Sequence, residues 1–157
     1  MNGQQIFGLQ VLPSFLVYGL VARWYVTPRL APLPLHAALQ PLLVLHALRH
    51  LGMVFLVPTV AGPALPAAFA APAAYGDLVA GLLAPASIVA LRAGTRAALP
   101  LTWVFNVVGL LDLINAFYQG LSHDVQLGAA YFIPTFIVPA LVITHLMIFR
   151  MLLRHAR

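Results

Sequence analysis

Five long apolar runs, at roughly 5–26, 35–60, 67–91, 97–119 and 128–153, constrain this chain more than any other feature. A bilayer core roughly 30 Å thick needs about 20 helical residues to span it, and each run is long enough. Of the 157 residues, 62% are hydrophobic and 7% charged, whereas soluble domains carry about 25% charged residues. We therefore predict an all-α, polytopic transmembrane bundle of about five spans, forming a single domain over residues 1–157.

The arginines predict the orientation of this bundle. Seven of the eight lie at the same ends of successive runs, namely Arg23, Arg29, Arg92, Arg96, Arg150, Arg154 and Arg157. The opposite loops, 60–66 and 120–127, have none, and loops rich in arginine stay in the cytoplasm. We expect a multi-pass protein of a bacterial inner (plasma) membrane, with its N-terminus outside and its C-terminus in the cytoplasm.

Composition excludes several classes of function. The net charge of +5 comes from arginines spread along the chain rather than from a patch, so we expect no nucleic-acid partner. Cysteine is absent, which excludes disulfides, thiolate metal sites and thiol nucleophiles. The serines have no evident His and Asp partners, and no Gly-rich phosphate loop occurs. Whether the protein is an enzyme is left undecided.

Three charged residues fall inside the apolar runs: Arg49, Asp77 and Asp112. A charge at the centre of a bilayer costs at least about 2.5–3.5 kcal/mol, so each needs a partner or a function. At 1.5 Å per residue, all three lie roughly 21–22 Å from the inner ends of their helices. We predict one buried cluster, with Arg49 within about 4 Å of Asp77 or Asp112.

Helical spacing enlarges this cluster. His46 and His50 share a helical face with Arg49, and Asn115 shares one with Asp112. The predicted ligand or proton site therefore consists of Arg49, Asp77, Asp112, His46, His50, Asn106 and Asn115. The same groups could instead be interhelical hydrogen bonds that stabilise the bundle by about 0.6 kcal/mol each.

Histidines leave two cofactor interpretations open. His46 and His50, four residues apart, present two imidazoles on one helical face, and His145 is a third metal-ligand candidate. Haem b held by His46 and His145 is the other interpretation. On this counting His145 lies roughly 7 Å nearer the inner surface than His46, a gap that helix tilt could close.

Small residues predict which span is central. Gly76, Ala80 and Ala84 repeat every four residues along the third run, and a stripe of small side chains lets another helix approach closely. We expect this span inside the bundle rather than facing lipid.

Four segments resemble an uncharacterised group of small bacterial multi-pass inner-membrane proteins with no known activity: His46–Arg49, Gly76–Pro85, Phe105–Asp112 and Val138–His145. The resemblance covers residues 42–153 and implies membrane residence and importance of the same polar positions. The leading function is binding or translocation of a small polar or protonatable ligand. The alternatives are electron transfer through haem b and metal-dependent catalysis on a lipid or quinone. Expected partners are membrane lipids, the ligand and a second copy of the chain.

Overall fold

A computed structural model describes residues 2–122 and 125–155, and over these residues the chain is helical with short connections. Five helices are long and apolar enough to cross a membrane: Gly3–Leu30, Leu35–Leu56, Ala67–Arg92, Ala98–Ser122 and Gly128–His155. The predicted number of apolar helices is confirmed, and their ends differ from the prediction by at most four residues.

Three of these helices are composite. The first comprises α1 (Gly3–Val21), the π-helical turn η1 (Ala22–Val26) and α2 (Thr27–Leu30). The second comprises α3 (Leu35–Ala47) and the 3-10 helix η2 (Leu48–Leu56). The fifth comprises η3 (Gly128–Tyr131), η4 (Ile133–Ile137) and α7 (Val138–His155). A short helix α4 (Pro58–Ala61) leads to α5 (Ala67–Arg92), which is followed by α6 (Ala98–Ser122). Asn2 caps α1 in a capping box with Gln5, and Gly94, at φ 62°, makes the tight turn between α5 and α6.

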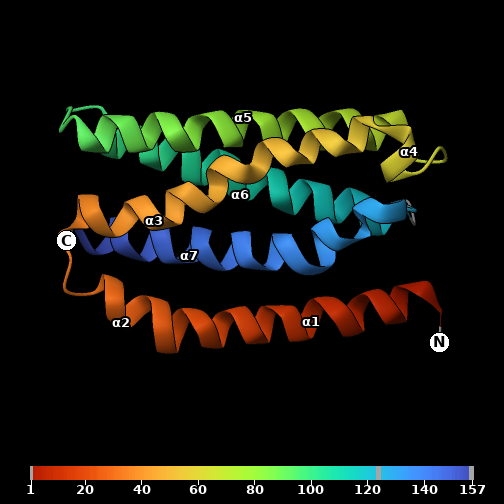
Figure 1. Ribbon diagram of the computed structural model, residues 1–157, viewed down its shortest axis with the longest axis horizontal. Coiled ribbons are helices and arrows are strands. Elements are labelled where there is room, and N and C mark those ends of the chain that lie inside the picture. The colour runs from red at the N-terminus through yellow and green to blue at the C-terminus, as the bar shows by residue number, and fades with distance from the viewer. Residues whose placement is uncertain (1, 123–124, 156–157) are drawn as a thin grey trace.

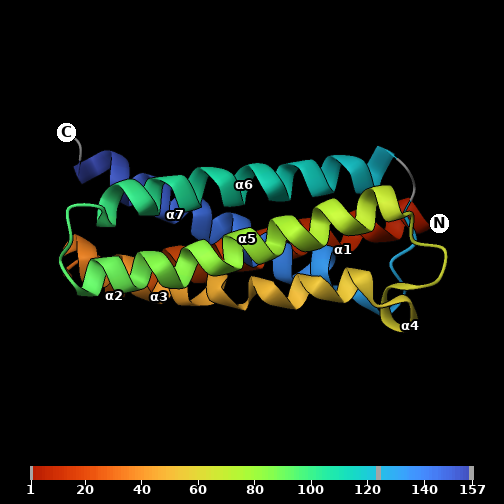
Figure 2. The same cartoon turned by 90° about the horizontal axis from the view of Figure 1, so that it is seen from above.

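The helices form layers (Figure 1). α5 and α6 pack along each other, and α3, η2 and α7 lie beneath them, with η2 crossing toward α5. α1 lies on the outside, against α7 and η4, and Val11 is the one residue of α1 that is buried. Seen from above, α5 and α6 run side by side over α3, α7 and α1 (Figure 2).

α5 is the central helix. Ala80 and Ala84 are fully buried, and α5 contacts α3, η2 and α6. The small-residue stripe of the sequence therefore faces helices, as predicted. In the half of the bundle near the C-terminus, large side chains from α3, α6 and α7 fill the space around α5, among them Leu39, Leu43, Phe105 and Ile148.

The second span departs from the prediction of a continuous α-helix. Residues Leu48–Leu56 form a 3-10 helix, which has three residues per turn rather than 3.6 and rarely runs beyond four residues. Its buried residues are accordingly Arg49, Gly52 and Phe55, three apart. This change of period alters which side chains share a face with Arg49.

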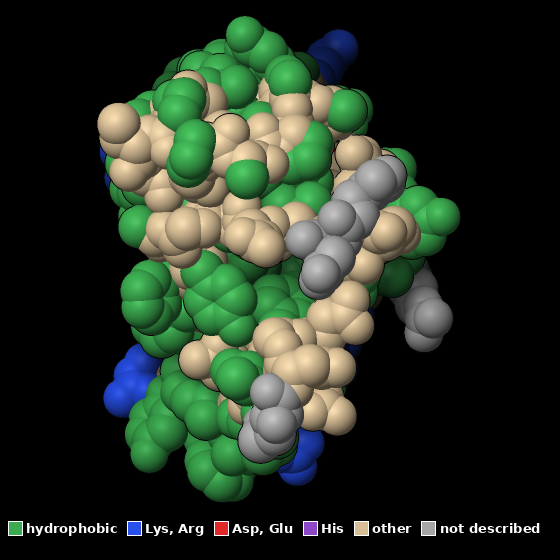
Figure 3. Space-filling model, turned by 90° about the vertical axis from the view of Figure 1, so that its right-hand side faces the viewer, with side chains coloured by type: hydrophobic (Ala, Val, Ile, Leu, Met, Phe, Trp, Pro, Cys, Tyr) green, Lys and Arg blue, Asp and Glu red, His purple; other side chains and the backbone are tan. Residues whose placement is uncertain are grey.

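The described arginines other than Arg49 gather at one end of the bundle. They belong to η1, α2, the α5–α6 connection and the end of α7, which all lie at the same end as the C-terminus (Figure 1). The opposite end carries the N-terminus and α4. Viewed from there, the described surface consists of hydrophobic side chains, uncharged other side chains and backbone, with arginine at the margins (Figure 3).

Candidate functional site

Arg49 joins three helices through one side chain. Its Nε donates to Asp77 Oδ1 on α5 at 2.8 Å, and its Nη2 donates to Asp112 Oδ2 on α6 at 2.6 Å. Its Nη1 donates to the carbonyl of Gly109 at 2.9 Å. The predicted pairing is confirmed, with both aspartates rather than one. We call Arg49, Asp77 and Asp112 the ion cluster.

Glycines make the room that the ion cluster occupies. A Cβ on Gly52 would overlap the Asp77 carboxylate, and a Cβ on Gly76 would overlap the Asp112 carboxylate. A Cβ on Gly109 would lie 2.9 Å from Arg49 Nη1. Each charged side chain of the ion cluster thus rests against a glycine of a neighbouring helix, so the bundle is built around these charges.

His145 extends the ion cluster toward α7. Its Nε2 lies 3.4 Å from Arg49 Nη1, and its Nδ1 lies 2.7 Å from Asn106 Oδ1. Because an amide oxygen only accepts and a guanidinium only donates, Nδ1 carries the proton and Nε2 faces Arg49 with its lone pair. Asn106 also donates from Nδ2 to the His145 carbonyl at 3.2 Å. Both residues are fully buried.

His46 lies beside His145 with its ring centroid 4.1 Å away. Its Nε2 is 3.0 Å from Thr144 Oγ1. The Thr144 hydroxyl donates to the Ala140 carbonyl at 2.9 Å, so the His46 Nε2–H donates to the hydroxyl. His46 Nδ1 is then an acceptor, and it is buried without a hydrogen-bond partner among residues 2–122 and 125–155.

The histidines as arranged do not fit the proposed cofactors. A haem iron bound by His46 and His145 needs a ring on each side of it, yet these two rings are in direct contact. Both nitrogens of His145 already face Asn106 and Arg49, and the positive guanidinium would repel a cation there. Within residues 2–122 and 125–155, no group of three or more metal-binding side chains is assembled.

A cavity of about 730 Å³ lies between the ion cluster and the N-terminal end of the bundle. Asp77 and Asp112 line it, whereas Arg49 does not. The side chain of Arg49 is 1% exposed, against 10% for Asp77 and 14% for Asp112. The cavity therefore meets the carboxylates and not the guanidinium that holds them.

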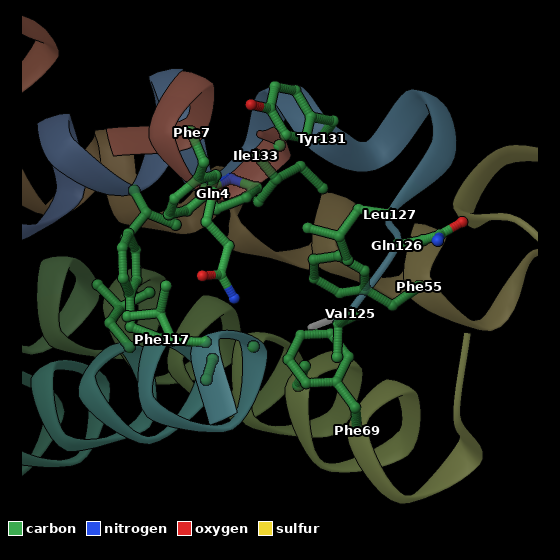
Figure 4. A pocket seen from close by; sticks show the side chains of 18 of the residues that line it. Gln4, Phe7, Phe55, Phe69, Phe117, Val125, Gln126, Leu127, Tyr131 and Ile133 are labelled. Carbon is green, nitrogen blue, oxygen red and sulfur yellow. The ribbon is translucent and has the colours of Figure 1, made fainter. Parts of the chain in front are cut away.

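Aromatic and amide side chains form the other walls of the cavity. They come from α1, η2, α5, α6 and the segment before α7, and include Phe7, Phe55, Phe69, Phe117, Tyr131 and Gln4. Gln4, from the first turn of α1, points into the cavity, with Phe117 on one side and Phe55 and Phe69 on the other (Figure 4). Asn2 and Gln126 also line it.

Two predicted site residues lie elsewhere. His50 is exposed and its Nδ1 lies 2.9 Å from the carbonyl of Ala47, because the 3-10 geometry of η2 turns it away from Arg49. Asn115 is also exposed. It lies on α6 almost one turn beyond Asp112, on a part of the helix surface that no other described helix covers. Arg49, Asp77, Asp112, His46 and Asn106 do come together.

Sequence reasoning missed other contributors. His145 was considered only as a metal or haem ligand, whereas it contacts Arg49 and Asn106. Thr144 and Gly109 were not singled out. Gly109, which lies between Asn106 and Asp112, was the available signal, since a glycine within a helix usually has a packing reason.

Comparison with known proteins gives a family but no activity. Residues 6–153 match the family model described as Domain of unknown function (DUF8737). The chain belongs to this family. The match covers all five apolar helices nearly in full and includes every residue of the ion cluster. No curated protein and no solved structure matches the chain.

Proposed function

We propose that the protein spans a bacterial inner membrane five times, with its N-terminus outside and its C-terminus in the cytoplasm. The outer surface of the bundle supports this, since large apolar side chains are exposed all along it, including Leu12, Val44, Leu82, Leu111 and Leu146. In water such a surface would drive aggregation; in lipid it is the expected exterior. The arginine-rich end would face the cytoplasm.

Within that membrane, we propose that the protein binds a small polar or protonatable ligand in the cavity above the ion cluster. One observation carries this proposal: Asp77 and Asp112 line a cavity while Arg49, which holds both, is sealed behind them. A volume of about 730 Å³ falls within the 300–1,000 Å³ typical of small-molecule sites. The cavity is mostly apolar with few polar groups, which is also typical.

A purely structural role explains the ion cluster less well. Replacing a buried ion pair with apolar side chains is often neutral or stabilising, so a bundle needs no such pair for stability. Both carboxylates are also partly exposed to the cavity. Groups that bind a ligand need that access.

Translocation would require a second arrangement of the helices. Below the ion cluster, Leu39, Leu43, Phe105 and Ile148 are fully buried and close the half nearer the C-terminus. The cavity is lined by residues of the half nearer the N-terminus, so in the proposed orientation this arrangement would be a binding state that faces outside. Passage of a ligand would need these side chains to separate while the ion cluster changes its protonation.

A thermal-shift screen of purified protein against small polar molecules tests binding. A ligand at 100 times its Kd stabilises the folded state by about 2.7 kcal/mol, so true ligands raise the melting temperature with the logarithm of their concentration once it exceeds Kd. We expect Asp112→Asn and Arg49→Gln to abolish this shift while the protein still inserts into the membrane. Asn115→Ala is the matched control for Asp112→Asn, and His50→Gln is the matched control for Arg49→Gln. Asn115 and His50 are close in sequence to the altered residues but are exposed.

The controls decide between binding and packing. If a hit shifts Asp112→Asn as much as the unaltered protein, the ion cluster is packing and the proposed site is wrong. If the control variants lose the shift as well, the effect is one of general stability rather than of the site.

A further inference from the structure

We propose that the ligand of this cavity is an organic cation with an apolar body, such as an aryl-alkyl ammonium ion. The inference rests on the proposed function and names the class of molecule that the site takes. The observation that carries it is that two carboxylates form one wall of the cavity and several aromatic rings form the other walls.

The charge presented to the cavity is negative. One arginine and two aspartates leave an excess of one negative charge when both carboxylates are ionised. Arg49 cannot turn to an anion in the cavity, because its nitrogens already face Asp77, Asp112, Gly109 and His145. Among the described residues, no Arg and no His lines the cavity. From the described residues, an anionic ligand would therefore meet carboxylates and no cationic side chain on the cavity lining.

Arg49 engages one oxygen of each carboxylate and leaves the other without a bond to it. Arg49 takes Oδ1 of Asp77 and Oδ2 of Asp112. Asp77 Oδ2 lies against Gly52 and Asp112 Oδ1 against Gly76, and neither oxygen accepts a hydrogen bond from the described part of the chain. An ammonium group donates up to three N–H bonds and accepts none, so it can pair with the carboxylates that line the cavity, which are acceptor-only when ionised.

The aromatic walls suit the rest of such a ligand. Phe55 and Phe69 meet edge to face at 5.8 Å, and Phe7 meets Phe117 at 6.1 Å and Tyr131 at 6.0 Å. Aromatic faces attract cations by about 0.5–2 kcal/mol each and also accept apolar groups. The same walls would offer a hydrated inorganic cation few oxygen ligands, and the cavity of about 730 Å³ is far larger than a bare ion needs.

Cysteine substitution measures the charge of the cavity without requiring a known ligand. The chain contains no cysteine, so one introduced thiol is the only reactive one. Ala116 lines the cavity on α6, and Ala64 is exposed in the connection after α4, outside the cavity lining. Ala116→Cys and Ala64→Cys would each be treated with a cationic, an anionic and a neutral methanethiosulfonate reagent in vesicles.

The measured quantity is the rate of modification by the cationic reagent divided by the rate by the anionic reagent. We expect this ratio to be about 10-fold or more higher for Ala116→Cys than for Ala64→Cys, because a charged cleft concentrates ions of opposite sign. Adding Asp112→Asn should bring the ratio close to that of Ala64→Cys. Equal cation and anion rates in the Ala116→Cys protein itself would overturn the inference, whether or not the double variant folds. A proton shared by the two carboxylates would give that result.

A binding arm separates this inference from the proposed function. Phenethylammonium, benzyltrimethylammonium, neutral 2-phenylethanol and anionic 3-phenylpropionate would be tested for protection of Ala116→Cys from the neutral reagent. The inference is supported if the cations protect the thiol, the alcohol and the anion do not, and this protection is lost when Asp112→Asn is added. Protection by the alcohol or the anion at least as strong as by the cations keeps a binding cavity and overturns cation selectivity. If the neutral reagent never reaches Ala116→Cys, the cavity is closed and both proposals are wrong.

Discussion

Gly109→Ala tests whether the helices close as tightly on the ion cluster as the structure has them. A Cβ at this position would lie 2.7 Å from His145 Cε1 and 2.9 Å from Arg49 Nη1, so these atoms would have to retreat by about 0.7 and 0.5 Å to reach 3.4 Å. Neither has space for this movement. The Arg49 side chain is 1% exposed and His145 is fully buried.

The expected cost follows from these overlaps. Overpacking a buried site costs about 1–3 kcal/mol, and weakening the Arg49 bond to the Gly109 carbonyl adds about 1 kcal/mol. We expect Gly109→Ala to lower the free energy of unfolding by about 2–4 kcal/mol. Equilibrium unfolding by sodium dodecyl sulfate in mixed micelles measures this difference.

Gly19→Ala is the matched control. Gly19 lies within α1 and has nothing within 4 Å of a built Cβ, so alanine there should be neutral or should stabilise by up to about 1 kcal/mol through helix propensity. Equal stability of the Gly109→Ala and Gly19→Ala proteins would show that α6 does not approach Arg49 and His145 this closely, and the packing argument would fail.

Three further predictions follow from the fold and the site. A green fluorescent protein fused at the C-terminus should fluoresce and an alkaline phosphatase fused there should be inactive; the reverse pattern would contradict the topology. Protein expressed with ample haem should show no Soret band after purification, because the contacting rings of His46 and His145 leave no place for an iron between them; a stoichiometric band would refute this geometry. Thr144→Val should destabilise by about 1–3 kcal/mol, since His46 Nε2 loses its partner, while Thr102→Val should cost less, because the Thr102 hydroxyl bonds to a carbonyl of its own helix; equal costs would argue against the His46 contact.

The ion cluster could be predicted from the sequence because the prediction needs only two quantities. These are the free-energy cost of an unpaired charge in a membrane and the depth of each charged residue along its helix. Three charges at a common depth in apolar helices have few alternatives to pairing, and Arg49 does meet both aspartates. The helix count follows from the lengths of the apolar runs in the same way. Neither prediction depends on which way a helix is rotated.

Predictions that depended on rotation fared unevenly. His50 was placed with Arg49 by assuming 3.6 residues per turn, but η2 has a 3-10 period that propensity does not reveal. Asn115 was placed with Asp112 by spacing alone, yet it is exposed. The cavity was beyond prediction, because it is formed by side chains of α1, η2, α5, α6 and the segment before α7, whose relative positions come from tertiary packing.

In the proposed membrane location, the position of α1 would make the shape of the cavity depend on the surrounding lipid. α1 has a single buried residue, Val11, and contributes Gln4 and Phe7 to the cavity lining. It packs against α7 and η4, with ring contacts of Phe7 to Phe117 and Tyr131 and of Tyr18 to Phe136 at 5.7 Å. In a membrane the opposite face of α1 would be pressed by acyl chains, so bilayer thickness and lateral pressure would help to set the width of the entrance. Ligand access would then differ between membranes of different composition, with no change in the protein sequence.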